Sequence, residues 1–181
     1  MIGFLANTIG RWQLKKQFAK VNRETEAINI SQVKKAVLVF TVLDEKSYTD
    51  ILKISTALKR DEGINELTLL AFNPNKEIPK YIDDQQITLF GEKELGITGI
   101  PKSEFAMELL REKFDLLLDF TPDSFLPTDY FLALLYAKTK VGKANEEKDY
   151  IFDLIIDIPI ESTLLDLSKN MIRYLKMINK A

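Results

Sequence analysis

The sequence predicts an α/β fold: a doubly wound, mainly parallel sheet of six strands between two layers of helices. One phrase occurs twice, as FDLLLDF at residues 114–120 and as FDLIIDI at residues 152–158. A short apolar run with a carboxylate at each end is typical of a strand buried on both faces, whose ends alone reach water. Apolar β-rich runs also alternate with segments of helical periodicity, which indicates parallel strands joined by right-handed crossovers.

The first half of the chain is expected to contain two helices and three strands. A helical segment near residues 3–22 precedes a first strand at residues 36–42. Asp44 stands at the N-cap of the next helix, which Gly63 ends. The second and third strands are expected at residues 67–72 and 87–90.

The second half continues the alternation. Pro101 opens a helix that leads into the strand at residues 114–120. A helix over residues 127–137 then precedes a brief strand at residues 140–142 and a charged loop. The last strand, residues 152–158, is followed by an amphipathic helix from about Ser162.

The strands favour the order 3-2-1-4-5-6 of a Rossmann-like sheet. Residues 1–23 are expected to form an extra basic amphipathic helix, and residues 24–181 a single Rossmann-like α/β domain. With 181 residues and 46% hydrophobic side chains, the chain is long enough to bury a full core.

Composition excludes many kinds of chemistry. The sequence contains no cysteine, so disulfides, thiolate metal sites and thiol nucleophiles are absent. It also contains no histidine, the usual proton shuttle at neutral pH and the commonest metal ligand. We therefore expect no catalytic residues, no metal site and no cofactor, and the balance favours a protein that is not an enzyme.

The charge is distributed unevenly. Residues 1–23 carry five basic residues and no acid, whereas the remaining 20 basic residues face 27 acidic ones. No apolar run reaches the roughly 18 to 20 residues needed to cross a bilayer. We expect a cytoplasmic protein, with peripheral contact to the inner membrane face left open as an alternative.

The basic N-terminal helix is one candidate contact surface. Its apolar residues form two stripes separated by Gly10, which suits packing on its own domain, contact with a protein partner or a second copy, or contact with a membrane or RNA. Nucleic acid is the least favoured, because stacking platforms do not alternate with the basic residues. The candidate partner-binding residues are Arg11, Trp12, Lys15, Lys16, Phe18 and Lys20.

The crevice beyond the carboxyl ends of the strands is the other candidate site. Ligands of such sheets lie where the strand order reverses, between the first and fourth strands. The loop over residues 42–47 contains no glycine, so a classical dinucleotide or Walker-type phosphate site is not expected. The candidate ligand-binding residues are Thr41, Asp44, Ser47, Asp119, Thr121, Ser124 and Asp157.

Two of these carboxylates, Asp119 and Asp157, also allow the hypothesis of a catalytic pair. If one strand separates their strands, Asp119 and Asp157 lie about 10 Å apart, roughly the span of an inverting glycosidase pair. In the alternative, each accepts hydrogen bonds from loop amides or caps the next helix. The second interpretation is favoured.

Two family resemblances follow from these passages. The run from Phe114 through Gly142 resembles the N-terminal half-domain of ADP-heptose-type (family 9) glycosyltransferases, which implies a shared fold. Residues 35–40, 95–102, 114–115 and 137–142 are similar to a small uncharacterised Bacteroidota family, a domain of unknown function. That resemblance covers most of the chain and implies no activity.

The leading hypothesis is a non-catalytic cytoplasmic α/β binding module that engages a protein partner, or a second copy, through its basic N-terminal helix. The alternative is a protein that binds a sugar nucleotide or phosphosugar in the strand-end crevice, as a glycosyltransferase-like half-domain. The sequence identifies no small-molecule ligand.

Overall fold

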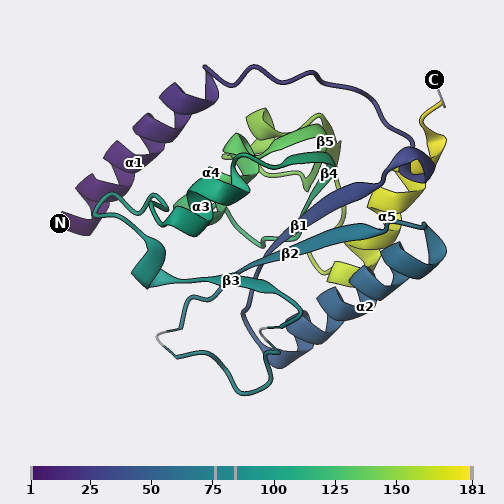
Figure 1. Cartoon of the computed structure of the whole chain (residues 1–181), viewed down its shortest axis with the longest axis horizontal. Helices are drawn as coiled ribbons and strands as arrows, with labels where there is room; N and C mark the ends of the chain where they lie inside the picture. The colour runs from purple at the N-terminus through teal and green to yellow at the C-terminus, as the bar shows by residue number, and fades with distance from the viewer. Residues whose placement is uncertain (1, 76, 84, 180–181) are drawn as a thin grey trace.

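A computed structural model describes residues 2–75, 77–83 and 85–179. Within them, six parallel strands form one sheet in the order β3-β2-β1-β4-β5-β6, which confirms the predicted fold and strand order (Figure 1). The order reverses between β1 and β4, so the carboxyl ends of these two strands define the switch point of the sheet. The strands are β1 (Lys35–Thr41), β2 (Glu66–Phe72), β3 (Thr88–Phe90), β4 (Lys113–Asp119), β5 (Tyr136–Lys143) and β6 (Leu154–Ile156).

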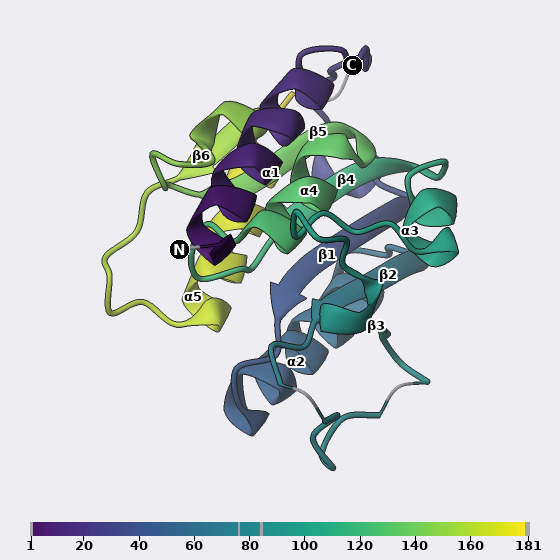
Figure 2. The same cartoon turned by 90° about the vertical axis from the view of Figure 1, so that its left-hand side faces the viewer.

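Helices cover both faces of the sheet (Figure 1, Figure 2). They are α1 (Ile2–Phe18), α2 (Glu45–Asp61), α3 (Glu104–Leu109), α4 (Leu126–Leu134) and α5 (Leu164–Met177). α2 and α5 share a core with Leu38 and Phe40 on one face. α3 and α4 share a second core with Val37 and Val39 on the other face, and α1 lies against α4. The side chains of Val37, Leu38 and Val39 are fully buried, which explains the uninterrupted apolar run of β1.

The first carboxylate of each repeated phrase fastens its segment to the neighbouring strand. Asp115 Oδ2 accepts hydrogen bonds from the amides of Lys34 and Lys35, at 3.0 and 3.1 Å. Asp153 Oδ2 accepts one from the amide of Lys140, at 2.8 Å. Both carboxylates therefore satisfy backbone donors of the adjacent strand, a structural role that the repeat itself did not reveal.

The boundary between α4 and β5 differs from the prediction. The helix expected over residues 127–137 ends before β5 begins at Tyr136. The buried amine of Lys140 donates hydrogen bonds to the carbonyls of Leu132 and Ala133, at 2.7 Å each. These two bonds satisfy carbonyls that a longer helix would have used, and the freed residues pair with β4 instead.

Other boundaries also moved. The strand expected at residues 152–158 contracts to β6, which pairs with the last three residues of β5. The first helix ends at Phe18 rather than near residue 22. The predicted cap at Asp44 is confirmed, and Gly63 follows α2 with a φ of 73°, the left-handed conformation that favours glycine there. Among the described residues, no helix is long and apolar enough to cross a membrane.

Close backbone approach fixes the position of α1. A Cβ atom placed on Gly10 would lie 2.4 Å from the carbonyl oxygen of Thr98 and 2.4 Å from a methyl group of Leu126. Leu14, one turn further along, is 1% exposed and belongs to the core on this face. α1 is therefore seated on the 96–100 loop and on α4 through the side that carries Gly10 and Leu14.

Candidate functional site

The loop after β1 is used to begin a helix. The Ser47 amide donates to Asp44 Oδ1 at 2.6 Å, and the Ser47 hydroxyl donates to the Asp44 carbonyl at 2.9 Å. The hydrogen bond from the Ser47 amide lowers the pKa of Asp44, which stays exposed to solvent. Thr41 is half-buried at the end of β1. These three predicted ligand-binding residues lie at the switch point, but two of them serve as a helix cap.

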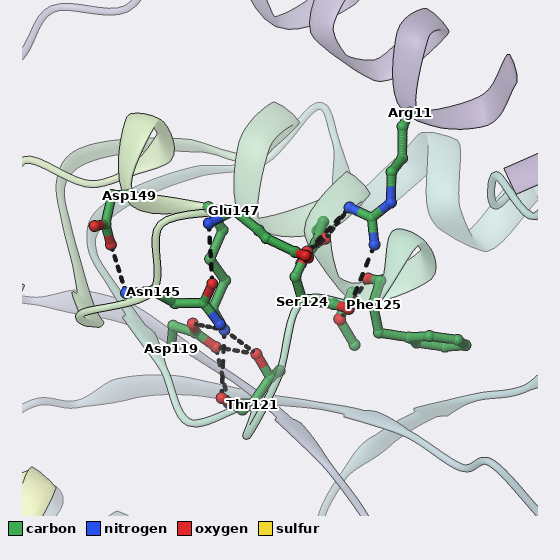
Figure 3. Close-up of polar contacts among 11 residues, drawn as sticks. Arg11, Asp119, Thr121, Ser124, Phe125, Asn145, Glu147 and Asp149 are labelled. Atoms are coloured by element: carbon green, nitrogen blue, oxygen red, sulfur yellow. Dashed lines mark hydrogen bonds and ion pairs between the residues drawn. The ribbon is translucent and has the colours of Figure 1, made fainter. Parts of the chain in front are cut away.

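A buried charged cluster lies at the carboxyl end of β4 (Figure 3). Asp119, Thr121 and Lys148 are at most 4% exposed. The Lys148 amine donates to Asp119 Oδ2 at 2.7 Å, to Thr121 Oγ1 at 2.7 Å and to the Thr121 carbonyl at 3.3 Å. Asp119 Oδ1 accepts from the amide and hydroxyl of Thr121, at 2.8 and 2.7 Å. The structure therefore brings Asp119 and Thr121 together, and the Lys148 amine is hydrogen-bonded to both.

The cluster satisfies its own hydrogen bonds. The three protons of the ammonium each have an acceptor, and both carboxylate oxygens of Asp119 have donors. A buried ion pair of this kind needs such completeness, because desolvation of the two charges is otherwise uncompensated. The bonds leave no group of the cluster pointing at a ligand, and they tie the loop between β5 and β6 to the end of β4.

A second polar cluster joins α1 to the start of α4 (Figure 3). The guanidinium of Arg11 donates to Ser124 Oγ at 3.0 Å and to Asp129 Oδ2 at 3.2 Å. The Ser124 hydroxyl donates to the same Asp129 oxygen at 2.6 Å. Burial raises the pKa of Asp129, although Ser124, Lys148 and Arg11 all act to lower it. Asp129 Oδ1 is buried and has no hydrogen-bond partner among the described residues.

Asp157 does not join either cluster. It is exposed beyond the end of β6, whereas Asp119 is buried and fully hydrogen-bonded. The strand β5 does separate β4 from β6, as the hypothesis of a catalytic Asp119–Asp157 pair required. Asp119 nevertheless accepts hydrogen bonds from its own loop, which is the structural role given above as the alternative to catalysis.

The predicted partner-binding residues of α1 divide into two groups. Arg11 points inward to Asp129, and Phe18 packs edge-on against Tyr150 with ring centroids 5.4 Å apart. Trp12 is 61% exposed, with the Lys16 amine 5.0 Å above its ring. The four that reach solvent are Trp12, Lys15, Lys16 and Lys20.

Three buried ionisable residues were not found from the sequence. Lys148 lies in a charged loop, whose residues are expected to be exposed to solvent. Asp129 lies within a helix of mostly apolar residues. Lys140 could have been found from the sequence, because its strand was expected between two others in the order 3-2-1-4-5-6. In the structure it is 0% exposed. Burial lowers the pKa of Lys140 to about 7, and the nearby charge of Arg23 acts in the same direction.

The charged groups of the two clusters are bonded to one another. Within residues 2–75, 77–83 and 85–179, no three acidic side chains gather as a metal site would require. Asp44, Asp119 and Asp129 are engaged by Ser47, Lys148 and Arg11, respectively. Ile9 and Trp12, on the outer side of α1, are exposed and take no part in these clusters.

Comparison with known proteins gives a family and no activity. A search of curated proteins finds no match. The family of unknown function DUF6913 matches residues 7–178, a span that includes the switch point, both polar clusters and most of α1. The chain therefore belongs to the family of unknown function DUF6913.

Proposed function

We propose that this protein is a non-catalytic binding module that engages another protein through the outer side of α1. One observation carries the proposal: α1 is seated by Gly10, Arg11 and Leu14 on one side, while its other side presents a tryptophan and an isoleucine to water. Trp12 is 61% exposed and Ile9 is 50% exposed. Large exposed apolar groups of this kind, set among lysines, are typical of contact residues.

The strand-end crevice supports the alternative less well. A sugar nucleotide or phosphosugar would need free donors or carboxylates at the switch point, and a phosphate would need flexible backbone there. The Lys148 amine already engages the oxygens of Asp119 and Thr121. The loop after β1 is committed to capping α2. We therefore assign the binding role to α1.

The experiment compares two surface variants. Trp12→Ala with Lys16→Glu alters the outer side of α1, and Tyr174→Ala with Lys169→Glu makes matched changes on the exposed side of α5. Proteins captured by the tagged wild-type chain from its native cells are identified and purified, and their affinities are measured by calorimetry. We expect the α1 variant to bind at least about tenfold more weakly and the α5 variant to bind normally.

Two further measurements complete this test. Circular dichroism establishes that both variants are folded. Unchanged affinity of the folded α1 variant would refute the proposal, as would a loss of the same size in the α5 variant. If the captured protein is a second copy of this chain, sedimentation at several concentrations shows self-association that the α1 variant abolishes, which supports the same contact surface.

A further inference from the structure

A groove runs between α1 and the segment that leads into α3. Its volume is about 600 Å³. Trp12 and Lys16 line it from α1, and Lys102 and Met107 line it from the opposite side. Its floor includes Tyr130 of α4, which is 5% exposed. The groove is distinct from the strand-end crevice, which lies beyond the sheet at the switch point.

The groove combines positive charge with apolar surface. The described residues that line it include three lysines, Lys16, Lys20 and Lys102, and no carboxylate. None of these lysines forms an ion pair within the part of the chain that the structure describes. Trp12 and Met107, which are 61% and 47% exposed, supply apolar contact area on the two sides. The surface therefore suits a negatively charged occupant that also carries an apolar group.

Both sides of the groove are held in place. On the side of α3, the Gly96 amide donates to the Ile100 carbonyl at 2.8 Å and the Lys102 amide donates to the Glu94 carbonyl at 3.0 Å. Gly99 has a φ of 78°, which allows the tight turn between them. On the other side, Gly10 seats α1 directly on this loop. A preformed groove binds without the entropy cost of ordering its own backbone.

We infer that this groove binds an acidic segment of a partner protein, one that carries an aromatic or aliphatic side chain among its carboxylates. This inference rests on the proposed function and adds the class of partner. A long polyanion such as nucleic acid is disfavoured, because residues 24–181 have an excess of seven negative charges that would repel it beyond the groove. A short acidic segment avoids that repulsion, since it contacts only the three lysines and the apolar residues between them.

The test uses a displayed library of random peptides of about 12 residues, selected on the immobilised full chain. We expect the selected sequences to be rich in Asp and Glu with at least one Phe, Leu or Trp. A synthetic peptide of the selected sequence is then measured by fluorescence polarisation. Its affinity should fall as salt rises, because charge attraction contributes to binding.

Variants on the side opposite α1 locate the peptide. Lys102→Glu with Met107→Ser changes the groove without touching α1, and Lys93→Glu with Ile97→Ser is the matched control at exposed positions of the same region. We expect the groove variant to lose at least about tenfold in affinity and the control to retain it. Selection of peptides without acidic residues, or equal affinity of the groove variant, would overturn the inference.

Two outcomes separate this inference from the proposed function. If the captured partner protein loses affinity for the α1 variant and keeps it for the groove variant, the proposed function stands and the groove inference fails. If a single-stranded RNA or vesicles of anionic lipid bind the chain and the acidic peptide does not, the inference about a protein segment is wrong. If the captured partner loses affinity for both the α1 variant and the groove variant, the result supports both the proposed function and the groove inference.

Discussion

The buried amine of Lys140 makes the stability of this protein depend on pH in a way that can be calculated. Burial lowers its pKa from 10.5 to about 7 in the folded state. Between these two values the unfolded chain binds a proton that the folded chain does not, so the free energy of unfolding rises with pH. The slope approaches about 1.4 kcal/mol per pH unit, and the gain between pH 7 and pH 9 is about 2 kcal/mol.

Lys140→Met removes this contribution. Urea unfolding of the wild type and the variant, followed by circular dichroism from pH 6 to pH 9.5, gives the difference between their free energies of unfolding. Other titrating groups cancel in that difference. We expect the wild type to gain about 2 kcal/mol relative to the variant between pH 7 and pH 9, and the difference to level off as the pH falls from 7 to 6.

A matched control separates burial from charge. Lys169→Met removes a lysine that is exposed on α5, so it should follow the wild type at every pH. Parallel stability curves for wild type and Lys140→Met across this range would refute the reasoning, because they would mean that the amine stays charged in the folded protein. A Lys140→Leu variant repeats the measurement with a different apolar side chain.

Three further outcomes are expected. Asp119→Asn removes the counter-charge of buried Lys148 and keeps the acceptor for Thr121, so urea unfolding should show a loss of about 3–5 kcal/mol. Adding Lys148→Met to this variant should recover most of it, because the uncompensated charge is then gone. Gly142→Ala would put a methyl group 2.4 Å from the ring of Phe152, so a thermal melt should report a loss of about 1–3 kcal/mol; an unchanged midpoint would show that the ring moves freely. Gly10→Ala should push α1 outward and speed hydrogen exchange throughout that helix, while exchange in β1 stays unchanged; equal protection of α1 in both proteins would contradict the close approach.

The sheet could be predicted because its signals are local and repeated. The strands are apolar runs of β-rich residues, each followed by a helix with recognisable caps such as Asp44. Alternation then restricts the topology to a small number of solutions. The strand order follows from this pattern, and the structure confirms it.

The roles of the charged residues could not be predicted in the same way. Lys148 and Asp119 are 29 residues apart in the sequence, and Arg11 and Asp129 are 118 apart. A lysine in a charged loop is predicted to be exposed unless its partner is known, because its neighbours in the sequence are the same as those of an exposed lysine. The same limit applies to the groove, since Trp12 and Met107 belong to elements that meet only in the folded chain.

The close approach of α1 to the 96–100 loop makes the position of the helix independent of the residues on its exposed side. Because Gly10 packs against the carbonyl oxygen of Thr98, backbone contact sets the distance between α1 and the 96–100 loop. The side chains on the exposed surface of α1 do not affect that distance. Substitutions on the exposed side of α1 therefore change its surface chemistry while the position of the helix on the 96–100 loop stays the same.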